Sequence, residues 1–189
     1  MTLRVIAGSA GGRRLVAPKG GARPTTDRLK EALFASLGAA RVDGASVLDL
    51  YAGSGALAIE ALSRGASRAV LVDHASDAIV AIRANLDTVG FEDRARVQRS
   101  TVAAFLRVPV VEAPFDVVFL DPPYDTPGTD VAQVLAHLAG AGMVGAGATV
   151  VVERPRTGEP IALPERWNVE RERVYGDTLL LTVRVDLTG

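Results

Sequence analysis

Five short apolar runs alternate with helical segments in the middle of the chain, and this alternation constrains the fold more than any other feature. The runs lie at residues 47–50, 69–73, 96–98, 115–120 and 148–152. The segments between them, about 55–64, 75–89, 102–107 and 128–141, repeat apolar residues at helical spacing. Strands that alternate with helices in this way form an open parallel sheet with helices on both faces. We therefore predict an α/β fold.

Two further runs, 168–175 and 178–185, alternate apolar and polar residues on either side of Gly176-Asp177. Period-two alternation around such a turn predicts an antiparallel hairpin at the end of the sheet. The fold expected is thus a Rossmann-like, mostly parallel sheet with one antiparallel element. Ligands of such sheets bind beyond the carboxyl ends of the strands. The residues that directly follow each strand are therefore the first candidates for function.

The first strand runs into a glycine-rich loop, Asp49-Leu50-Tyr51-Ala52-Gly53-Ser54-Gly55. Glycine allows a ligand to approach the backbone closely, and the helix that follows offers free amide groups. With Asp73 placed to bind a ribose diol, the loop also satisfies the loose dinucleotide fingerprint. The glycines alone therefore do not separate NAD from S-adenosylmethionine, and a loop that only makes a tight turn gives the same pattern.

Asp49 favours one of these cofactors. It lies four residues before Gly53, where a carboxylate would repel the pyrophosphate of a dinucleotide. A carboxylate there suits the sulfonium and α-ammonium groups of S-adenosylmethionine. We predict that Asp49 binds the methionine end, in part through water, that Gly53 and Gly55 let the cofactor lie against the loop, and that Asp73 accepts the ribose hydroxyls.

The fourth strand ends in Asp121-Pro122-Pro123-Tyr124, the most specific string in the chain. Its prolines stiffen the backbone and leave carbonyl oxygens without competing amide partners. We expect the Asp121 carboxylate and the Pro122 carbonyl to accept hydrogen bonds from an exocyclic amino group, which directs the nitrogen lone pair at the methyl group and stabilises the developing charge. Tyr124 is expected to stack on the base. Taken alone, the string is also compatible with an ordinary turn.

The N-terminal segment is basic, although the net charge of the chain is −1. Residues 1–30 contain seven Arg and Lys residues and a single acid. Two apolar runs, 3–7 and 13–17, flank a glycine-rich turn and predict a small β-hairpin. Further on, residues 25–27 are a plausible helix cap, and apolar residues at helical spacing from Leu29 to Leu37 predict a helix that Gly38 ends. A basic segment on an acidic body is typical of a protein that binds a polyanion, but a solvated tail has the same charge pattern.

Four strings, taken together, resemble one family. They are Arg23-Pro24-Thr25-Thr26-Asp27-Arg28, Asp49 to Ala56, Glu60-Ala61-Leu62-Ser63-Arg64-Gly65-Ala66, and Asp121 to Tyr124. In this order they are similar to the bacterial small-subunit ribosomal RNA guanine-N2 methyltransferases of the RsmD type, over nearly the whole chain. The resemblance implies a seven-stranded class I methyltransferase fold and S-adenosylmethionine as donor. It also implies a guanine of 16S RNA, in an assembled or assembling small subunit, as acceptor.

Further residues are candidates for contact with the cofactor or with RNA. Many amino-methyltransferases carry an acidic or amide residue after the third strand that reads the cofactor's adenine, and Ser100 stands in that place here. Its hydroxyl can accept one hydrogen bond, although a helix cap is an equal alternative. The cofactor contacts expected are Asp49, Tyr51, Gly53, Ser54, Gly55, Asp73, Ser100, Thr101 and Thr25. The RNA contacts expected are Arg4, Arg13, Arg14, Arg23 and Arg28. We expect residues 1–24 to form the RNA-contacting arm and 25–189 the methyltransferase domain.

Several residues near the strand ends receive structural interpretations. Glu153 ends the fifth strand on the functional rim, but a solvated glutamate is the favoured interpretation. Residues 175–178 are a candidate border of the base pocket, but a simple hairpin turn is favoured. His74 and His137 are expected at the surface, and Trp167 in the core.

The remaining composition narrows the alternatives. Cysteine is absent and the two histidines are not paired at metal-ligand spacing, so no metal site is expected. No apolar run approaches the ~18 residues of a membrane span, and we expect a monomer in the cytoplasm. Adenine-N6 methylation of DNA or RNA uses the same chemistry, but such enzymes usually carry an added recognition domain. A dinucleotide-dependent oxidoreductase leaves residues 121–124 unexplained, and intact motifs disfavour a catalytically silent RNA-binding protein.

Overall fold

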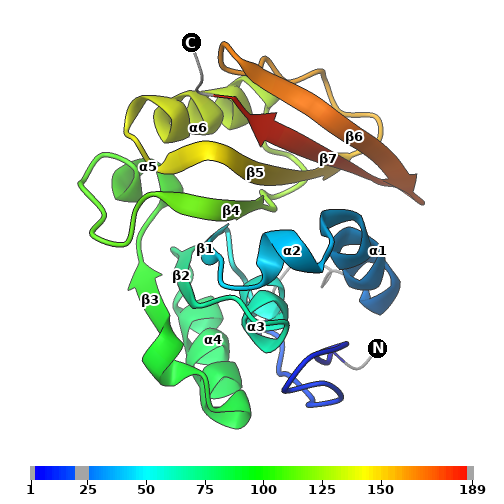
Figure 1. The fold of residues 1–189 in the computed structure, drawn as a ribbon, viewed down its shortest axis with the longest axis vertical. Coiled ribbons are helices and arrows are strands. Elements are labelled where there is room, and N and C mark those ends of the chain that lie inside the picture. The colour runs from blue at the N-terminus through cyan, green and yellow to red at the C-terminus, as the bar shows by residue number, and fades with distance from the viewer. Residues whose placement is uncertain (1–2, 20–25, 187–189) are drawn as a thin grey trace.

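The computed structural model describes residues 3–19 and 26–186, and its centre is a seven-stranded sheet with the order β3-β2-β1-β4-β5-β7-β6 (Figure 1). The strands are β1 (Ser46–Leu50), β2 (Arg68–Asp73), β3 (Ala95–Arg99), β4 (Phe115–Leu120), β5 (Val144–Pro155), β6 (Trp167–Tyr175) and β7 (Thr178–Val185). β1 to β5 are parallel to one another, whereas β7 pairs antiparallel with both β5 and β6. The mostly parallel sheet with a C-terminal antiparallel hairpin is confirmed.

Helices cover both faces of this sheet and divide the core in two. They are α1 (Asp27–Leu37), α2 (Ala39–Val42), α3 (Ala56–Ser63), α4 (Ser76–Val89), α5 (Val102–Phe105) and α6 (Gly128–Gly140), with a 3-10 turn at Glu92–Arg94. Apolar side chains of α1, α3 and α4 pack on one face, and those of α5 and α6 pack on the other. Among these elements, only the short α2 and the 3-10 turn were not expected from the sequence.

The strands alternate their side chains between these two layers. Val47 and Phe119 belong to the core on the α3 side, whereas Leu48 and Leu120 belong to the core on the α6 side. This alternation is the period of two that a β-strand imposes. It decides which of the polar residues at the strand ends share a face.

The N-terminal segment forms a hairpin that is packed against the body of the protein. Its pairing is shorter than two regular strands, and within residues 3–19 it contains an antiparallel bridge between Arg4 and Arg14. Four of its apolar side chains, Leu3, Val5, Ala10 and Leu15, lie in the same core as α1 and α3. The hairpin is therefore continuous with the rest of the fold, and the division at residue 24 stays a prediction about function.

The Glu60–Ala66 string explains how the hairpin is held. The buried Glu60 carboxylate on α3 accepts hydrogen bonds from the amides of Ile6 (2.7 Å) and Ala7 (3.0 Å). The Ser63 hydroxyl accepts a further bond from the Ala10 amide at 2.9 Å. These bonds satisfy backbone groups that a hairpin leaves unpaired on its outer edge. The Glu60–Ala66 string therefore holds the N-terminal hairpin against α3.

A buried lysine joins the same segment to α1. Lys30 is fully buried, donates to the carbonyl of Arg4, and lies 3.5 Å from the Asp27 carboxylate. Burial lowers the pKa of Lys30, and the nearby acids Asp27 and Glu60 oppose that shift. The Thr26 hydroxyl caps α1 by accepting from the Leu29 amide at 3.3 Å, and Gly38 ends the helix, as expected.

Three single residues, Trp167, His74 and His137, lie where they were expected. Trp167 is buried in the core on the α6 side, and His74 and His137 are exposed. In residues 3–19 and 26–186, no helix is long and apolar enough to cross a membrane. No group of three or more metal-ligating side chains occurs in the same part of the chain.

Candidate active site

Four carboxylates gather at the carboxyl edge of the parallel strands. Asp49 lies in β1, Asp73 ends β2, Asp121 follows β4, and Glu153 lies near the end of β5. The strand alternation puts all four on the α3 side of the sheet, because Leu71, Phe119 and Val151, each two residues earlier on β2, β4 and β5, belong to that core. Burial raises the pKa of both Asp49 and Glu153; the charge of Asp121 adds to both shifts, and that of Asp73 adds to the shift of Asp49. Such an acidic cluster is matched to a cationic ligand.

Asp49 is the most deeply buried member of the four, with 2 % of its surface exposed. Its carboxylate accepts a hydrogen bond from the Ala58 amide in the first turn of α3, at 3.1 Å. Burial raises the pKa of Asp49 to about 8, and the bond from Ala58 opposes this effect. Burial disfavours the charged form of an acid, so a nearby positive charge would restore it.

The loop between β1 and α3 has an unusual backbone. Gly53 and Gly55 have φ of 57° and 75°, and Tyr51 also has a positive φ of 62°, which is rare for a bulky residue. A Cβ on Gly55 would lie 2.8 Å from Leu71 Cδ2, so no larger residue fits there without movement. The Asp73 carboxylate accepts from the amides of Gly53 and Ala75, each at 2.9 Å. The loop is therefore fixed to the end of β2.

Asn85 on α4 ties this loop to the N-terminal hairpin. Its buried side-chain amide donates to the carbonyls of Ser54 and Val16, both at 2.9 Å, and accepts from the Val16 amide at 2.7 Å. One side chain thus satisfies three backbone groups from two distant segments. Sequence reasoning did not identify Asn85, because it looks like any polar residue on an amphipathic helix.

Asp121 to Tyr124 lead from β4 toward a pocket beside the β6–β7 turn. Pro122 is buried, whereas Pro123 and Tyr124 are exposed. The Tyr124 ring is 50 % exposed, and its hydroxyl lies 2.6 Å from the Thr178 hydroxyl. An aromatic ring held by one edge, with a free face, is suited to stack on a planar group.

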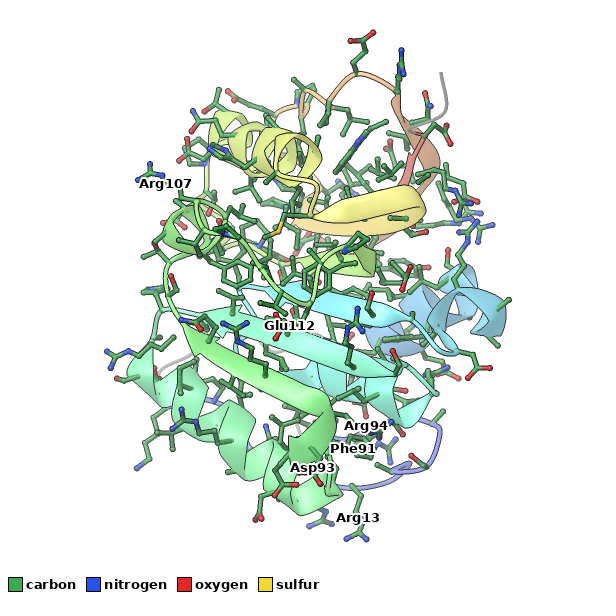
Figure 2. The ribbon with its side chains drawn as sticks, turned by 60° about the vertical axis from the view of Figure 1, so that its left-hand side comes forward. Arg13, Phe91, Asp93, Arg94, Arg107 and Glu112 are labelled. Atoms are coloured by element: carbon green, nitrogen blue, oxygen red, sulfur yellow. The ribbon has the colours of Figure 1, made fainter. Side chains whose placement is uncertain are left out.

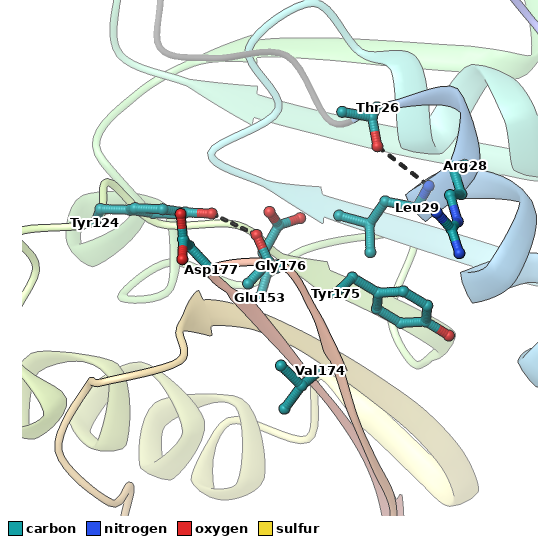
Figure 3. A pocket seen from close by; sticks show the side chains of 10 residues that line it. Thr26, Arg28, Leu29, Tyr124, Glu153, Val174, Tyr175, Gly176 and Asp177 are labelled. Atoms are coloured by element: carbon teal, nitrogen blue, oxygen red, sulfur yellow. Dashed lines mark hydrogen bonds between the residues drawn. The ribbon is translucent and has the colours of Figure 1, made fainter.

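The pocket has a volume of about 340 Å³. It is lined by Thr26, Arg28, Leu29, Tyr124, Glu153, Val174, Tyr175, Gly176, Asp177 and Thr178 (Figure 3). The lining bears on two expectations, of which the one for Glu153 is wrong. Residues 175–178 form the hairpin turn, but they also line the pocket. Glu153 is not solvated, since only 7 % of its surface is exposed.

Glu153 is the main residue that sequence reasoning missed. Burial raises its pKa to about 8, and the charge of Asp121 contributes in the same direction. Its Oε2 atom has no hydrogen-bond partner within the described part of the chain. The only signal in the sequence was its place at the end of a strand, and a strand end alone does not reveal what covers it.

The remaining cofactor candidates lie around the end of β3. The Ser100 amide donates to the Asp73 carbonyl at 3.0 Å, and its hydroxyl donates to the Thr101 carbonyl at 3.0 Å. The helix cap here is Thr101, whose hydroxyl accepts from the Ala104 amide at 3.2 Å. Thr25 lies outside the described residues.

The arginines expected to contact RNA are distributed over the N-terminal region. Arg13 and Arg14 are exposed, and Figure 2 shows Arg13 at the lower end of the molecule, far from Arg107 at the left edge of its upper half. Arg4 is exposed and pairs with Asp27 at 2.9 Å. Arg28 lines the pocket, and Arg23 lies outside the described residues.

The strand order distinguishes this site from a dinucleotide site. Dinucleotide-binding sheets follow the order 3-2-1-4-5-6. Here the antiparallel β7 lies between β5 and β6, and acids rather than free amides dominate the strand ends. The fold and site together define a class I methyltransferase architecture.

Comparison with known proteins then identifies the family. A family model described as "Conserved hypothetical protein 95" matches residues 3–184, and the chain belongs to this family. Ribosomal RNA small subunit methyltransferase D of Escherichia coli strain K12 is 36 % identical over 175 residues, which cover 92 % of this chain and 85 % of that protein. The protein of the same name from Haemophilus influenzae is 34 % identical over 176 residues, covering 92 % and 89 %. The resemblance to the RsmD type is confirmed.

Solved structures agree with this family. The structure titled "Putative methyltransferase yhhF from Escherichia coli" superposes with a TM-score of 0.87 at 34 % identity and covers all of both chains. An RNA methyltransferase from Salinibacter ruber, solved with S-adenosyl-L-homocysteine, superposes with a TM-score of 0.65 at 20 % identity, covering 88 % of this chain and 96 % of that one. This second likeness supports the fold alone.

Proposed function

We propose that this protein transfers a methyl group from S-adenosylmethionine to the exocyclic N2 of a guanine in 16S ribosomal RNA, within the small ribosomal subunit or its assembly intermediate. The observation that carries the proposal is the pairing of two features on one face of the sheet. One is the acidic cluster of Asp49, Asp73, Asp121 and Glu153, and the other is the pocket under Tyr124 that adjoins it.

The residues at the first two strand ends fit S-adenosylmethionine. The glycine loop lets a ligand lie against the backbone, and Asp73 at its side is placed to accept ribose hydroxyls. The buried carboxylate of Asp49 suits a positive charge, because such a charge would lower its raised pKa. The other contacts in the proposal are Tyr51, Ser54, Ser100, Thr101 and Thr25. When bound, the cofactor supplies a methyl group on a reactive sulfonium.

Residues after β4 position the acceptor. The Asp121 carboxylate and the Pro122 carbonyl accept hydrogen bonds from the amino group and thereby direct its lone pair toward the methyl donor. The same two acceptors stabilise the positive charge that develops on nitrogen. Pro123 stiffens the turn, and Tyr124 stacks on the base. The residues do their work by positioning and electrostatics, and the target base has to leave its stack to enter the pocket.

The names of the relatives support ribosomal RNA as the acceptor. Two relatives that share at least 34 % identity over most of the chain are small-subunit ribosomal RNA methyltransferases. Exposed arginines of the N-terminal region, Arg4, Arg13, Arg14 and Arg28, together with Arg23, contact RNA phosphates in this proposal. The protein acts as a monomer in the cytoplasm, where small subunits are assembled.

The test compares acceptors and one variant. Wild-type protein and tritiated S-adenosylmethionine are incubated with small subunits that lack the modification, with naked 16S RNA, and with DNA. Label should enter RNA of the small subunit, and label found only in DNA would overturn the proposal. Asp121→Ala should lower the rate by about 10²- to 10³-fold, whereas Asp125→Ala, an exposed acid beside the motif, should leave it unchanged.

A further inference from the structure

Glu153 belongs to the acidic cluster, but the steps outlined above give it no contact with the cofactor or the base. Figure 3 shows its carboxylate between Tyr124 and Leu29, among the side chains that line the cavity. Only 7 % of the residue is exposed, and its Oε2 has no hydrogen-bond partner within the described residues. A buried polar atom without a partner costs free energy. A buried carboxylate oxygen without a partner, in a substrate pocket, points to a ligand that donates a hydrogen bond to it.

The neighbour of Glu153 indicates which part of the ligand it meets. Leu120 of β4 pairs with Val152 of β5, so Asp121 and Glu153 are the next residues on adjacent parallel strands. Such strands lie about 4.8 Å apart, and both side chains are on the α3 side of the sheet. An amino group held by Asp121 therefore has Glu153 beside it.

The bases differ in what they place beside an exocyclic amino group. In guanine, the ring nitrogen N1 next to N2 carries a hydrogen and is a donor. In adenine and cytosine, the ring nitrogen at the corresponding place, N1 or N3, is an acceptor. An ionised carboxylate can accept hydrogen bonds but cannot donate one, so it attracts the ring N–H of guanine and repels the ring lone pair of adenine or cytosine.

We propose that Glu153 selects guanine: its ionised carboxylate accepts a hydrogen bond from N1–H of the base whose N2 amino group Asp121 holds. This inference rests on the proposed function and adds to it a physical reason for the choice of base. Adenine or cytosine, placed with its amino group at Asp121, would set a lone pair against Glu153. Leaving such polar groups unpaired is what makes a site reject the wrong base strongly.

The electrostatics of the pocket make the charge of Glu153 depend on the group that binds beside it. Burial and the charge of Asp121 raise the pKa of Glu153 to about 8, so near neutral pH the empty pocket favours the protonated acid, and ionising it costs free energy. A donor that approaches Oε2 stabilises the ionised form and offsets that cost. A protonated Glu153 would instead donate a hydrogen bond and would suit adenine, which makes the charge of this one side chain the basis of selection.

The experiment uses Glu153→Gln, which keeps the shape of the side chain but replaces one acceptor with a donor. Glu172→Gln, an exposed glutamate on β6, serves as the matched control. Wild type and variants receive small subunits that carry either guanine or adenine at the position that the wild type methylates. Methyl transfer is followed at several subunit concentrations to separate kcat from KM. Affinity for S-adenosylhomocysteine is measured by calorimetry.

Glu153→Gln should lower kcat/KM on guanine subunits by about 10- to 100-fold and narrow the preference for guanine over adenine. Affinity for S-adenosylhomocysteine should stay within about twofold of wild type, which also shows that the variant is folded. Glu153→Asp retains a carboxylate and should therefore keep part of the preference for guanine over adenine. An unchanged guanine-to-adenine ratio in Glu153→Gln would overturn the inference, as would an equal loss of cofactor affinity and transfer. If the wild type itself methylates no guanine of the subunit, the proposed function fails and this inference fails with it.

Discussion

The Asp73 carboxylate at the end of β2 accepts a hydrogen bond from the Gly53 amide, 2.9 Å away, and so fixes the glycine loop to the neighbouring strand. Its other oxygen accepts from the Ala75 amide. The same carboxylate is proposed to bind the ribose hydroxyls. Asp73 thus shapes the loop and contributes to the cofactor surface that the loop forms.

Asp73→Asn should weaken binding of S-adenosylhomocysteine by roughly 10- to 100-fold, because one of its two acceptor oxygens becomes a donor that faces a backbone amide. Isothermal titration calorimetry measures the change. Asp87→Asn, an exposed acid on α4, should bind as the wild type does. Equal affinities for Asp73→Asn and wild type would remove Asp73 from the cofactor site.

Gly55→Ala should destabilise the protein by about 2–3 kcal/mol, since the new Cβ meets both an unfavourable φ and the Leu71 side chain at 2.8 Å. Gly90→Ala is the matched control, because Gly90 has a similar φ of 72° but no atom within 4 Å of the added Cβ. It should cost only about 1 kcal/mol. Urea unfolding gives both values, and equal losses in the two variants would show that the contact with Leu71 does not matter.

Arg13→Ala combined with Arg14→Ala should reduce the dependence of RNA binding on salt. Each phosphate contact contributes about 0.7–0.9 to the slope of log K against log salt concentration, so the slope should fall by about 1–2. Arg107→Ala removes an exposed charge far from Arg13 and should leave the slope unchanged. Cofactor affinity should not change in any of these variants. A matching loss of cofactor affinity would mean that the hairpin arginines are structural.

The pH dependence of stability should reveal the buried acid in β1. The pKa of Asp49 is raised from its ordinary value of 3.8 to about 8 by burial, so the folded state binds a proton that the unfolded state releases between these values. This contribution to stability is complete below about pH 4 and is lost as the pH rises toward 8. Asp49→Asn should therefore gain stability relative to wild type by roughly 1–3 kcal/mol between pH 5 and 8. A constant difference across this range would contradict the burial of the carboxylate.

Most of the fold could be predicted from the sequence, because its signals are local. The strands carry continuous apolar runs, the helices carry apolar residues at helical spacing, and Thr26 and Gly38 mark the ends of α1. Asp49, Asp73 and Asp121 could be predicted for the same reason, since each directly follows or ends a strand. Their common face follows from the period of two along each strand.

The features that the sequence did not predict depend on contacts between residues that are far apart in the chain. Asn85 binds backbone groups 31 and 69 residues away, so no local pattern reveals its role. Glu153 is buried because the pocket brings together α1, Tyr124 and the turn before Thr178, three segments that the sequence separates. The basic N-terminal segment was expected as an arm, but its apolar residues pack in the main core. The charge pattern of a segment indicates that it binds a polyanion, but it does not show whether the segment packs against the core of the protein.

Nucleoside analysis tests the central claim most directly. Small subunits lacking the modification are incubated with the protein and S-adenosylmethionine, the 16S RNA is digested to nucleosides, and the products are identified by chromatography and mass spectrometry. The account predicts N2-methylguanosine, absent when Asp121→Ala replaces the wild type. N6-methyladenosine as the product, or no methylated nucleoside at all, would contradict it.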